Sequence, residues 1–337
     1  MSRFWWLSPG DPARRTGGFI YNANIVNEMR EQGHEVHVLR LDAAWPFPEG
    51  ARFAERLDAI PDAATVVADG LMWTGLSARE RARLATRCAV WVVVHSPLDM
   101  EGGGEDVAER ECEALKEATG WWATSRPTAE LMAKRLGSAQ VHCICPGTEV
   151  AQASDPRVGS RLLVVAHLIP RKGHDRLFSA LARLKDVDWT LTIVGSTEVD
   201  SDWSALMRTR AATLGIAERL VWRGVLDDVA LQEAMSSHGL LVHAARYEAY
   251  GMVLTEALAS GLPVMSTEAG ALDGLSSSAI MPLPSSGDPA AWEAMLREWL
   301  TDTARQQASF RSASTLGWPS WREQARALAA LLSMPEE

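Results

Sequence analysis

Short apolar runs rich in branched side chains alternate with amphipathic helical stretches along the whole chain, which is the pattern of an α/β protein. In the first half these runs predict strands at Phe4–Leu7, Glu35–Leu39, Thr65–Ala68, Ala89–His95, Trp121–Thr124 and Val141–Cys145. In the second half they predict strands at Leu162–His167, Thr190–Gly195, Leu220–Arg223, Leu240–Ala244 and Pro263–Ser266. Helical stretches such as Ile20–Gln32 and Gly104–Ala118 separate the runs, so both halves repeat the same plan.

This alternation predicts parallel sheets, because a pair of parallel strands needs a crossover that a helix normally supplies. We therefore expect two doubly wound, Rossmann-like domains that face each other across a cleft. Residues 151–160 are small, polar and interrupted by Pro156, which is typical of a linker. The first domain is predicted to span residues 1–155 and the second residues 156–315, and residues 316–337 predict a C-terminal helix that docks onto the body.

The net charge of −10 argues against nucleic acid as a general partner, because nucleic-acid-binding domains usually carry a basic surplus. No stretch approaches the ~20 consecutive apolar residues of a transmembrane segment, and the N-terminus lacks a basic region followed by an apolar run. We expect a cytoplasmic protein with free cysteine thiols; a peripheral contact with a membrane stays open. The doublets Trp5–Trp6 and Trp121–Trp122 fall in strand-like runs and predict core packing.

The segment with the most candidate ligand-binding residues spans residues 238–266, where an apolar strand leads into a polar loop and then a helix that begins near Gly251. Ligands of parallel sheets bind at the carboxyl ends of strands, where helix N-termini present free N–H groups. A phosphate at Gly251, Met252 and Val253 fits this rule. Glu248 and Glu256 flank that position, and carboxylates would repel a phosphate, so we expect them to bind sugar and ribose hydroxyls. The pattern predicts a nucleotide-sugar site.

Three further segments offer candidate binding residues. Arg171 and Lys172 lie in a basic turn between a strand and a helix, where a diphosphate would sit. Gly17 and Gly18 follow the first strand and precede a helix, which suits a backbone that approaches a ligand closely. His95 ends the strand that begins at Ala89, again at a carboxyl end.

The segment from Glu248 to Val264 reads E-A-Y-G-M-V-L-T-E-A-L-A-S-G-L-P-V. It resembles the retaining glycosyltransferases of family 4, which have the GT-B fold of two Rossmann-like domains and carry two glutamates separated by seven residues in this context. The resemblance covers nearly the whole chain and is more specific in the second half, the donor domain, than in the first half, where the acceptor would bind.

The resemblance implies roles for individual residues. The first glutamate lies by the donor sugar and the second holds the ribose, so these roles fall to Glu248 and Glu256. Lys172 matches a lysine on the donor diphosphate, while His167 stands where the family has an arginine for the same diphosphate. Gly17 and Gly18 match a Gly-Gly turn that faces the donor. His95 matches a histidine that contacts the donor sugar.

The implied activity is retaining, metal-independent transfer of a hexose-type sugar from a UDP- or GDP-sugar to an unidentified acceptor such as a glycan, a lipid or a small metabolite. No cofactor is expected. Two alternatives stay open: a catalytically silent sugar-nucleotide-binding subunit, which the replacement of the arginine by His167 motivates, and a GT-B epimerase or phosphorylase.

Two acidic pairs, Asp186 with Asp188 and Asp200 with Asp202, resemble the Asp-x-Asp element that holds Mg²⁺ or Mn²⁺ in other transferases. Both pairs flank predicted turns without supporting ligands, so we expect solvated loops and no metal site. The absence of a Gly-x-Gly-x-x-Gly fingerprint also weakens a nicotinamide interpretation.

Overall fold

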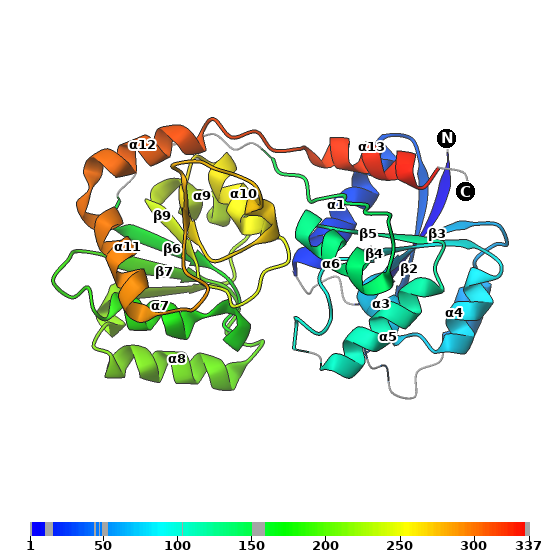
Figure 1. Cartoon of the computed structure of the whole chain (residues 1–337), viewed down its shortest axis with the longest axis horizontal. Coiled ribbons are helices and arrows are strands. Elements are labelled where there is room, and N and C mark those ends of the chain that lie inside the picture. Colours follow the sequence, from blue (N-terminus) through cyan, green and yellow to red (C-terminus); the bar gives the residue numbers. More distant parts are fainter. Residues whose placement is uncertain are drawn as a thin grey trace. The chain divides into compact units, whose positions relative to one another are not determined.

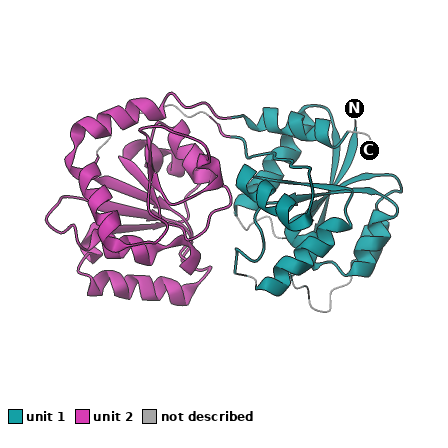
Figure 2. Cartoon of the chain, viewed as in Figure 1, with its two compact units in different colours: residues 1–147, 319–337 teal, residues 148–318 magenta. Residues whose placement is uncertain are grey.

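The computed structural model describes residues 2–10, 16–43, 45–46, 48, 53–102, 104–149 and 159–333. The chain forms two compact units (Figure 2). Unit 1 comprises Met1–Gly147 and Pro319–Glu337, and unit 2 comprises Thr148–Trp318. The units thus divide at Gly147, eight residues before the boundary predicted after residue 155, which lies outside the described residues. The predicted separate C-terminal segment belongs to unit 1 from Pro319 onward.

Unit 1 contains a parallel five-stranded sheet in the order β2-β1-β3-β4-β5. Its strands are β1 (Arg3–Pro9), β2 (Glu35–Leu41), β3 (Thr65–Asp69), β4 (Ala89–Val94) and β5 (Gly120–Ala123). Its helices are α1 (Gly17–Glu31), α2 (Ala54–Asp58), α3 (Gly70–Gly75), α4 (Ala78–Ala85), α5 (Glu105–Lys116), α6 (Arg126–Leu136) and α13 (Trp321–Leu331). The strand order reverses between β1 and β3, which is where doubly wound sheets bind ligands.

Unit 2 contains a parallel six-stranded sheet in the order β11-β10-β9-β6-β7-β8, which reverses between β9 and β6. Its strands are β6 (Arg161–Val165), β7 (Thr190–Val194), β8 (Leu220–Gly224), β9 (Leu240–His243), β10 (Val264–Ser266) and β11 (Ile280–Pro282). Its α-helices are α7 (His174–Leu181), α8 (Ser201–Thr213), α9 (Asp228–Ser237), α10 (Met252–Ala259), α11 (Pro289–Thr301) and α12 (Thr303–Ala313). Helices cover both faces of each sheet (Figure 1). The prediction of two doubly wound parallel-sheet domains is confirmed.

Strand alternation builds a core on each face of the second sheet, as pleated geometry requires. Leu162 and Val164 of β6 pack into a cluster that contains the buried Trp189, Trp292 and Trp299. Leu163, between them, packs into the opposite cluster with residues of α10. Each of these tryptophans donates its indole N–H to a backbone carbonyl, at 2.9 Å in all three cases. The core of unit 2 that contains these tryptophans is therefore apolar without leaving their indole N–H groups unpaired.

The tryptophan doublets pack into unit 1 as predicted. Trp6 and Trp122 are fully buried and meet edge to face with 6.5 Å between ring centroids. Trp121 is almost fully buried, and Trp5 stacks on His37 at 4.7 Å. These rings fill the space between the sheet and its helices.

One strand prediction was wrong, and one strand was missed. Val141–Cys145 is no strand: it makes a single bridge, between Ala123 and Cys143, and the side chain pattern leaves Val141 exposed. Apolar alternation without a full set of ladder hydrogen bonds explains this error. The short strand β11 was missed, because three residues that include a proline give little strand signal.

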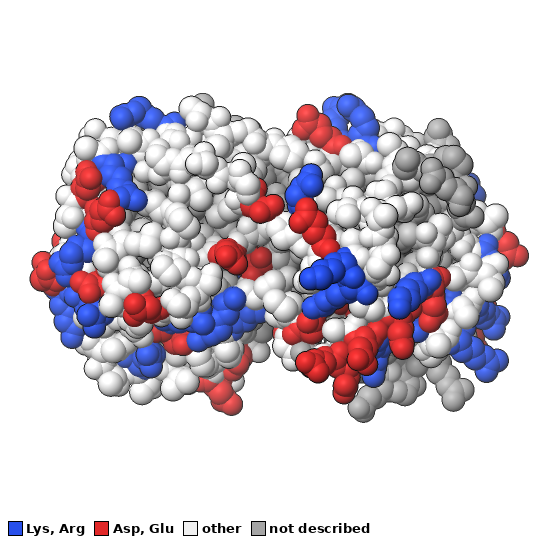
Figure 3. All heavy atoms as spheres, viewed as in Figure 1, with Lys and Arg blue, Asp and Glu red and all other residues white. Residues whose placement is uncertain are grey.

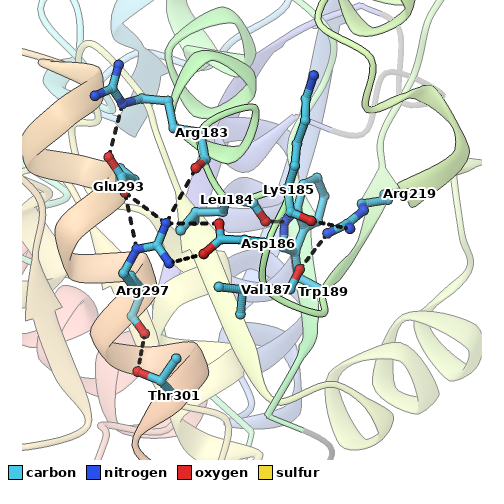
Figure 4. A network of polar contacts seen from close by, with 10 residues as sticks. All are labelled: Arg183, Leu184, Lys185, Asp186, Val187, Trp189, Arg219, Glu293, Arg297 and Thr301. Atoms are coloured by element: carbon cyan, nitrogen blue, oxygen red, sulfur yellow. Dashed lines mark hydrogen bonds and ion pairs between the residues drawn. The ribbon is translucent and has the colours of Figure 1, made fainter.

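The acidic turn at Asp186 is engaged by arginine (Figure 4). Arg297 of α11 donates to both carboxylate oxygens of Asp186, at 2.6 and 3.1 Å, and to Glu293 at 3.1 Å. The Arg297 guanidinium lowers the pKa of the Asp186 carboxyl below its usual value. Within the described ranges, no group of three or more His, Cys, Asp or Glu side chains is arranged to hold a metal ion.

The surface carries both signs of charge. On the face shown in Figure 3, acidic and basic side chains are interspersed over both units, and neither sign covers the face. None of the helices within the described part of the chain has the length and apolar character that crossing a membrane requires.

Helix α13 packs against α1 within unit 1. Trp321 meets Tyr21 edge to face at 5.9 Å, and Arg322 O accepts a hydrogen bond from Gln32 Nε2 at 3.0 Å. Tyr21 in turn links three parts of unit 1, because its hydroxyl accepts from Trp122 Nε1 at 3.1 Å and donates to Ile144 O at 3.0 Å.

Replacing Tyr21 by Phe tests that link. The substitution leaves the buried Trp122 N–H and Ile144 carbonyl without partners, which should lower the free energy of unfolding of unit 1 by about 1–3 kcal/mol. Urea denaturation followed by tryptophan fluorescence measures the change. A variant as stable as the wild type would mean that water replaces the hydroxyl without cost.

Candidate active site

The candidate site of unit 2 lies where its strand order reverses. Two loops leave the carboxyl ends of the neighbouring strands there: residues 166–173 after β6, which include the 3-10 helix Pro170–Lys172, and residues 244–251 after β9. Both predicted basic residues lie in the first loop and Glu248 in the second. The topology therefore brings together side chains that lie 76 positions apart in the sequence.

Backbone and side-chain hydrogen bonds hold these two loops together, an arrangement called the clasp below. Arg246 N–H donates to Arg171 O at 2.7 Å, and the Arg171 guanidinium donates back to Tyr247 O at 3.1 Å. Arg246 also forms a two-pronged ion pair with Asp175, at 3.0 and 2.6 Å. Arg171, predicted to bind the donor, thus holds the loop that carries Glu248.

Gly173 makes the clasp sterically possible. Its φ is +69°, and a Cβ atom at this position would lie 1.9 Å from Ala244 O. Only glycine fits both the left-handed conformation and the close approach of the second loop. Lys172 precedes Gly173 directly, so this contact fixes how near Lys172 lies to residues of the second loop.

Glu248 is the electrostatic centre of the site. Its Oε2 accepts from Lys172 Nζ at 2.5 Å and lies 3.1 Å from His243 Nε2, while only 15% of its side chain is exposed. Burial by itself would raise the pKa of the Glu248 carboxyl, but the charge of Lys172 and the contact with His243 outweigh it and lower the pKa far below its usual value. Glu248 is therefore an ionised, buried carboxylate.

Sequence reasoning missed His243. This histidine is the last residue of β9 and is 4% exposed; its Nδ1 lies 3.1 Å from Ser266 Oγ at the end of β10. Ser266 Oγ also donates to Thr267 O at 2.7 Å. The signal that could have found His243 was its place at a strand's carboxyl end, five residues before Glu248.

Helix α10 begins where the sequence predicted. Gly251 caps it with φ +90°, and a Cβ there would lie 2.8 Å from Leu254 Cδ1 and 3.2 Å from Glu248 Cγ. Met252 and Val253 form the first turn and are half-buried, and Glu256 is half-buried in the next turn. The N–H groups of the first turn therefore start beside Glu248.

His167 follows β6 and has a structural contact. Its Nδ1 accepts the backbone N–H of Ser196, after β7, at 3.1 Å, and Leu168 N–H donates to Ser196 O at 3.0 Å. The residue that stands in place of the expected arginine thus ties together the loops after two neighbouring strands.

His174, the first residue of α7, also escaped the sequence analysis. It is 1% exposed, and neither ring nitrogen has a hydrogen-bond partner among the described residues. Burial lowers the pKa of His174 to about 4; the neighbouring Asp175 opposes this shift, while Lys172 and His243 act with burial. A neutral, unsatisfied imidazole therefore lies among the groups around Glu248.

In unit 1 the candidate residues also gather at the point where the strand order reverses. His95 follows β4, and its Nε2 lies 3.2 Å from Oδ2 of Asp69, the last residue of β3. The buried Asp69 also accepts from Asn22 Nδ2 at 2.9 Å and from Leu71 N–H at 3.0 Å. Asp69 was not singled out from the sequence. Burial opposes the ionisation of Asp69, yet the contacts with His95 and Asn22 lower its pKa overall.

Gly18 packs against His95: a Cβ at Gly18 would lie 3.1 Å from His95 Cδ2. The Gly-Gly pair was expected in a turn before the helix. Instead Gly17 and Gly18 form the first turn of α1, after Thr16, and residues 11–15 of the predicted loop lie outside the described residues.

The sequence comparison with protein families gives one match. Residues 155–315 match the family described as Glycosyl transferases group 1. This segment contains both loops of the unit 2 site, with Lys172, Glu248 and Glu256.

Two curated relatives are mannosyltransferases. The chain is 24% identical over 329 residues to an MMP α-(1→4)-mannosyltransferase of Mycolicibacterium hassiacum, with 76% of this chain and 78% of the relative covered. It is 29% identical over 240 residues to a GDP-mannose-dependent α-(1-6)-phosphatidylinositol monomannoside mannosyltransferase of Mycolicibacterium smegmatis, with 62% and 60% covered.

A solved structure shares the whole fold. Anabaena HepE, crystallised with UDP and glucose, superimposes with a TM-score of 0.79 and 16% identity, covering 98% of this chain and 99% of HepE. This likeness shows the GT-B fold. Together, the family match, the relatives and the fold support a GT-B glycosyltransferase.

The buried His174 predicts a pH dependence of stability. Because its folded-state pKa is depressed from 6.5 to about 4, its contribution is complete above pH 6.5 and is lost as the pH falls toward 4. Replacing His174 by Met should therefore reduce the loss of stability between about pH 7.5 and pH 5.5 by about 1 kcal/mol. Thermal melts at both pH values measure it; equal acid sensitivity in variant and wild type would contradict the assignment.

Proposed function

We propose that the protein is a retaining, metal-independent glycosyltransferase that moves a hexose from a UDP- or GDP-sugar to an acceptor. The observation that carries the proposal is the buried, ionised Glu248, paired with Lys172 beside the N-terminus of α10 at the switch point of the unit 2 sheet. A nucleotide sugar needs a cationic place for its diphosphate next to a hydroxyl acceptor for its sugar, and this arrangement supplies both.

The diphosphate would lie against the first turn of α10. The free N–H groups there carry roughly half a positive charge, and Gly251 has no side chain to block them. Lys172 adds a full charge on a flexible stem. As the bond to the sugar breaks, negative charge grows on the leaving diphosphate, and these fixed positive groups stabilise it.

Glu248 would bind and orient the donor sugar. Both of its contacts reach Oε2, so within the described residues Oε1 has no partner and is the oxygen that a sugar hydroxyl would meet. A carboxylate that accepts a hydrogen bond from His243 is a weaker nucleophile than a free one, which favours a mechanism without a glycosyl–enzyme bond. The acceptor then attacks on the face that the diphosphate leaves, and a phosphate oxygen takes its proton. Glu256, farther along α10, would hold the ribose.

The relatives point to two different nucleotide bases for the donor. The M. smegmatis relative is named as GDP-mannose-dependent, whereas HepE was crystallised with UDP. The two mannosyltransferase relatives favour mannose among the hexoses to be tested. We therefore propose a hexose donor without choosing the base.

The test measures release of nucleoside diphosphate from GDP-mannose, UDP-glucose and related donors, with acceptor panels and excess chelator. We expect turnover with one base, and an α-linked product from an α-linked donor, as read from anomeric coupling constants by NMR. Glu248→Gln should lower kcat about 100-fold, because a group that stabilises the transition state is lost. The matched control is Glu218→Gln, an exposed glutamate of the same unit, which should leave kcat unchanged.

Three results would contradict parts of the proposal. A strict requirement for added metal would contradict metal independence, and a product of inverted anomeric configuration would contradict retention. Nucleotide binding with no turnover on any acceptor would favour a catalytically silent sugar-nucleotide-binding subunit.

A further inference from the structure

Lys172 has two tasks that compete. In the structure its ammonium group contacts Glu248 Oε2 at 2.5 Å, but the proposed function also requires it at the donor diphosphate. A diphosphate carries more negative charge than one carboxylate and would draw the flexible lysine toward itself. Glu248 would then lose the partner that most strongly stabilises its charge, and a buried carboxylate without compensation is costly.

His243 is the other contact of the same oxygen. Its Nε2 faces a carboxylate oxygen at 3.1 Å, so this nitrogen carries a proton and donates it. The ring cannot swing away easily, because it is 4% exposed and Ser266 Oγ holds its opposite nitrogen at 3.1 Å. Unlike Lys172, His243 is therefore a rigid partner.

Apart from Lys172 and His243, the neighbouring polar groups among the described residues do not contact the Glu248 carboxylate. Arg171 is directed to Tyr247 O, and Arg246 is paired with Asp175. His174 is buried and has no hydrogen-bond partner among the described residues. In the contacts made by the described residues, Lys172 and His243 are the only groups that reach the Glu248 carboxylate.

We propose that His243 is a positioning residue that keeps Glu248 ionised and oriented while the donor diphosphate draws Lys172 away from it. This role rests on the proposed function. Binding of the diphosphate thus exchanges one ion pair for another, and Glu248 keeps a hydrogen-bond donor throughout. Without His243, Lys172 stays with Glu248, because leaving would strand the carboxylate.

The experiment compares nucleoside mono- and diphosphates on the full chain. Isothermal titration calorimetry gives Kd for UMP, UDP, GMP and GDP with the wild type, His243→Leu and His243→Gln. Only the diphosphates carry the second phosphate that competes for Lys172. In His243→Leu we expect diphosphate affinity to fall about tenfold, the loss of one hydrogen bond to a charged group, while monophosphate affinity is unchanged. Glutamine places an amide donor near the position of Nε2 and should restore part of the preference.

The controls separate this role from a merely structural one. His238→Leu removes another buried histidine of unit 2, which contacts Ala234 O and Thr192 Oγ1, and should leave both affinities unchanged. In a Lys172→Ala background, His243→Leu should have no further effect on the preference for diphosphate, because the competing lysine is gone. If His243→Leu fails to fold, Ser266→Ala, which frees the ring, should lower the diphosphate preference in the same direction.

Two outcomes would overturn the inference and are distinguishable from a failure of the proposed function. An undiminished preference for diphosphate in His243→Leu, or an equal loss for mono- and diphosphate, removes the role of His243 while leaving a nucleotide-binding protein. A wild type that binds no nucleoside diphosphate removes the proposed function and this role with it.

Discussion

The ion pair between Lys172 and Glu248 is the interaction on which the unit 2 site depends. Two charges in a site of low exposure are tolerated only when each compensates the other, because burial of a lone charge costs several kcal/mol. The pair joins the loops after β6 and β9, the two strands at which the sheet reverses its order. The other contacts between these loops, such as the backbone hydrogen bond from Arg246 to Arg171 O and the bond from the Arg171 guanidinium to Tyr247 O, keep the two charges close to each other.

The same logic holds on a smaller scale in unit 1. Asp69 is buried at the end of β3, and it is ionised because His95, Asn22 and a backbone N–H surround its carboxylate. Each unit thus has a buried carboxylate near the reversal of its strand order, with a histidine at or just after a strand end beside it: His95 after β4 in unit 1, and His243 at the end of β9 in unit 2. Parallel sheets make this recurrence natural, since all their carboxyl ends, and the helix N-termini that follow, lie along one edge.

Much of this architecture could be predicted from periodicity. The strands of both sheets except β11, the start of α10 at Gly251 and the core positions of the tryptophan doublets follow from local patterns of apolar residues. Val141–Cys145 shows the limit: alternation alone does not reveal whether a partner strand is available. His243 and Asp69 were missed for a related reason. Asp69 acquires its importance through contacts with Asn22 and His95, which are distant in sequence, and His243 through a contact with Glu248 across a loop whose shape the sequence does not reveal. An apolar strand that ends in a polar residue does not show what that residue will touch.

The clasp between the two loops has a consequence for altering the protein. Arg246 and Asp175 lie at its rim and do not contact the Glu248 carboxylate, yet they secure the backbone on which Glu248 is mounted. Gly173 sets the spacing of the loops and admits no side chain, so it offers no room for adjustment. The Arg246–Asp175 pair is instead a place where substitutions could loosen or stiffen the two loops gradually, shifting Glu248 relative to Lys172 without replacing either of them.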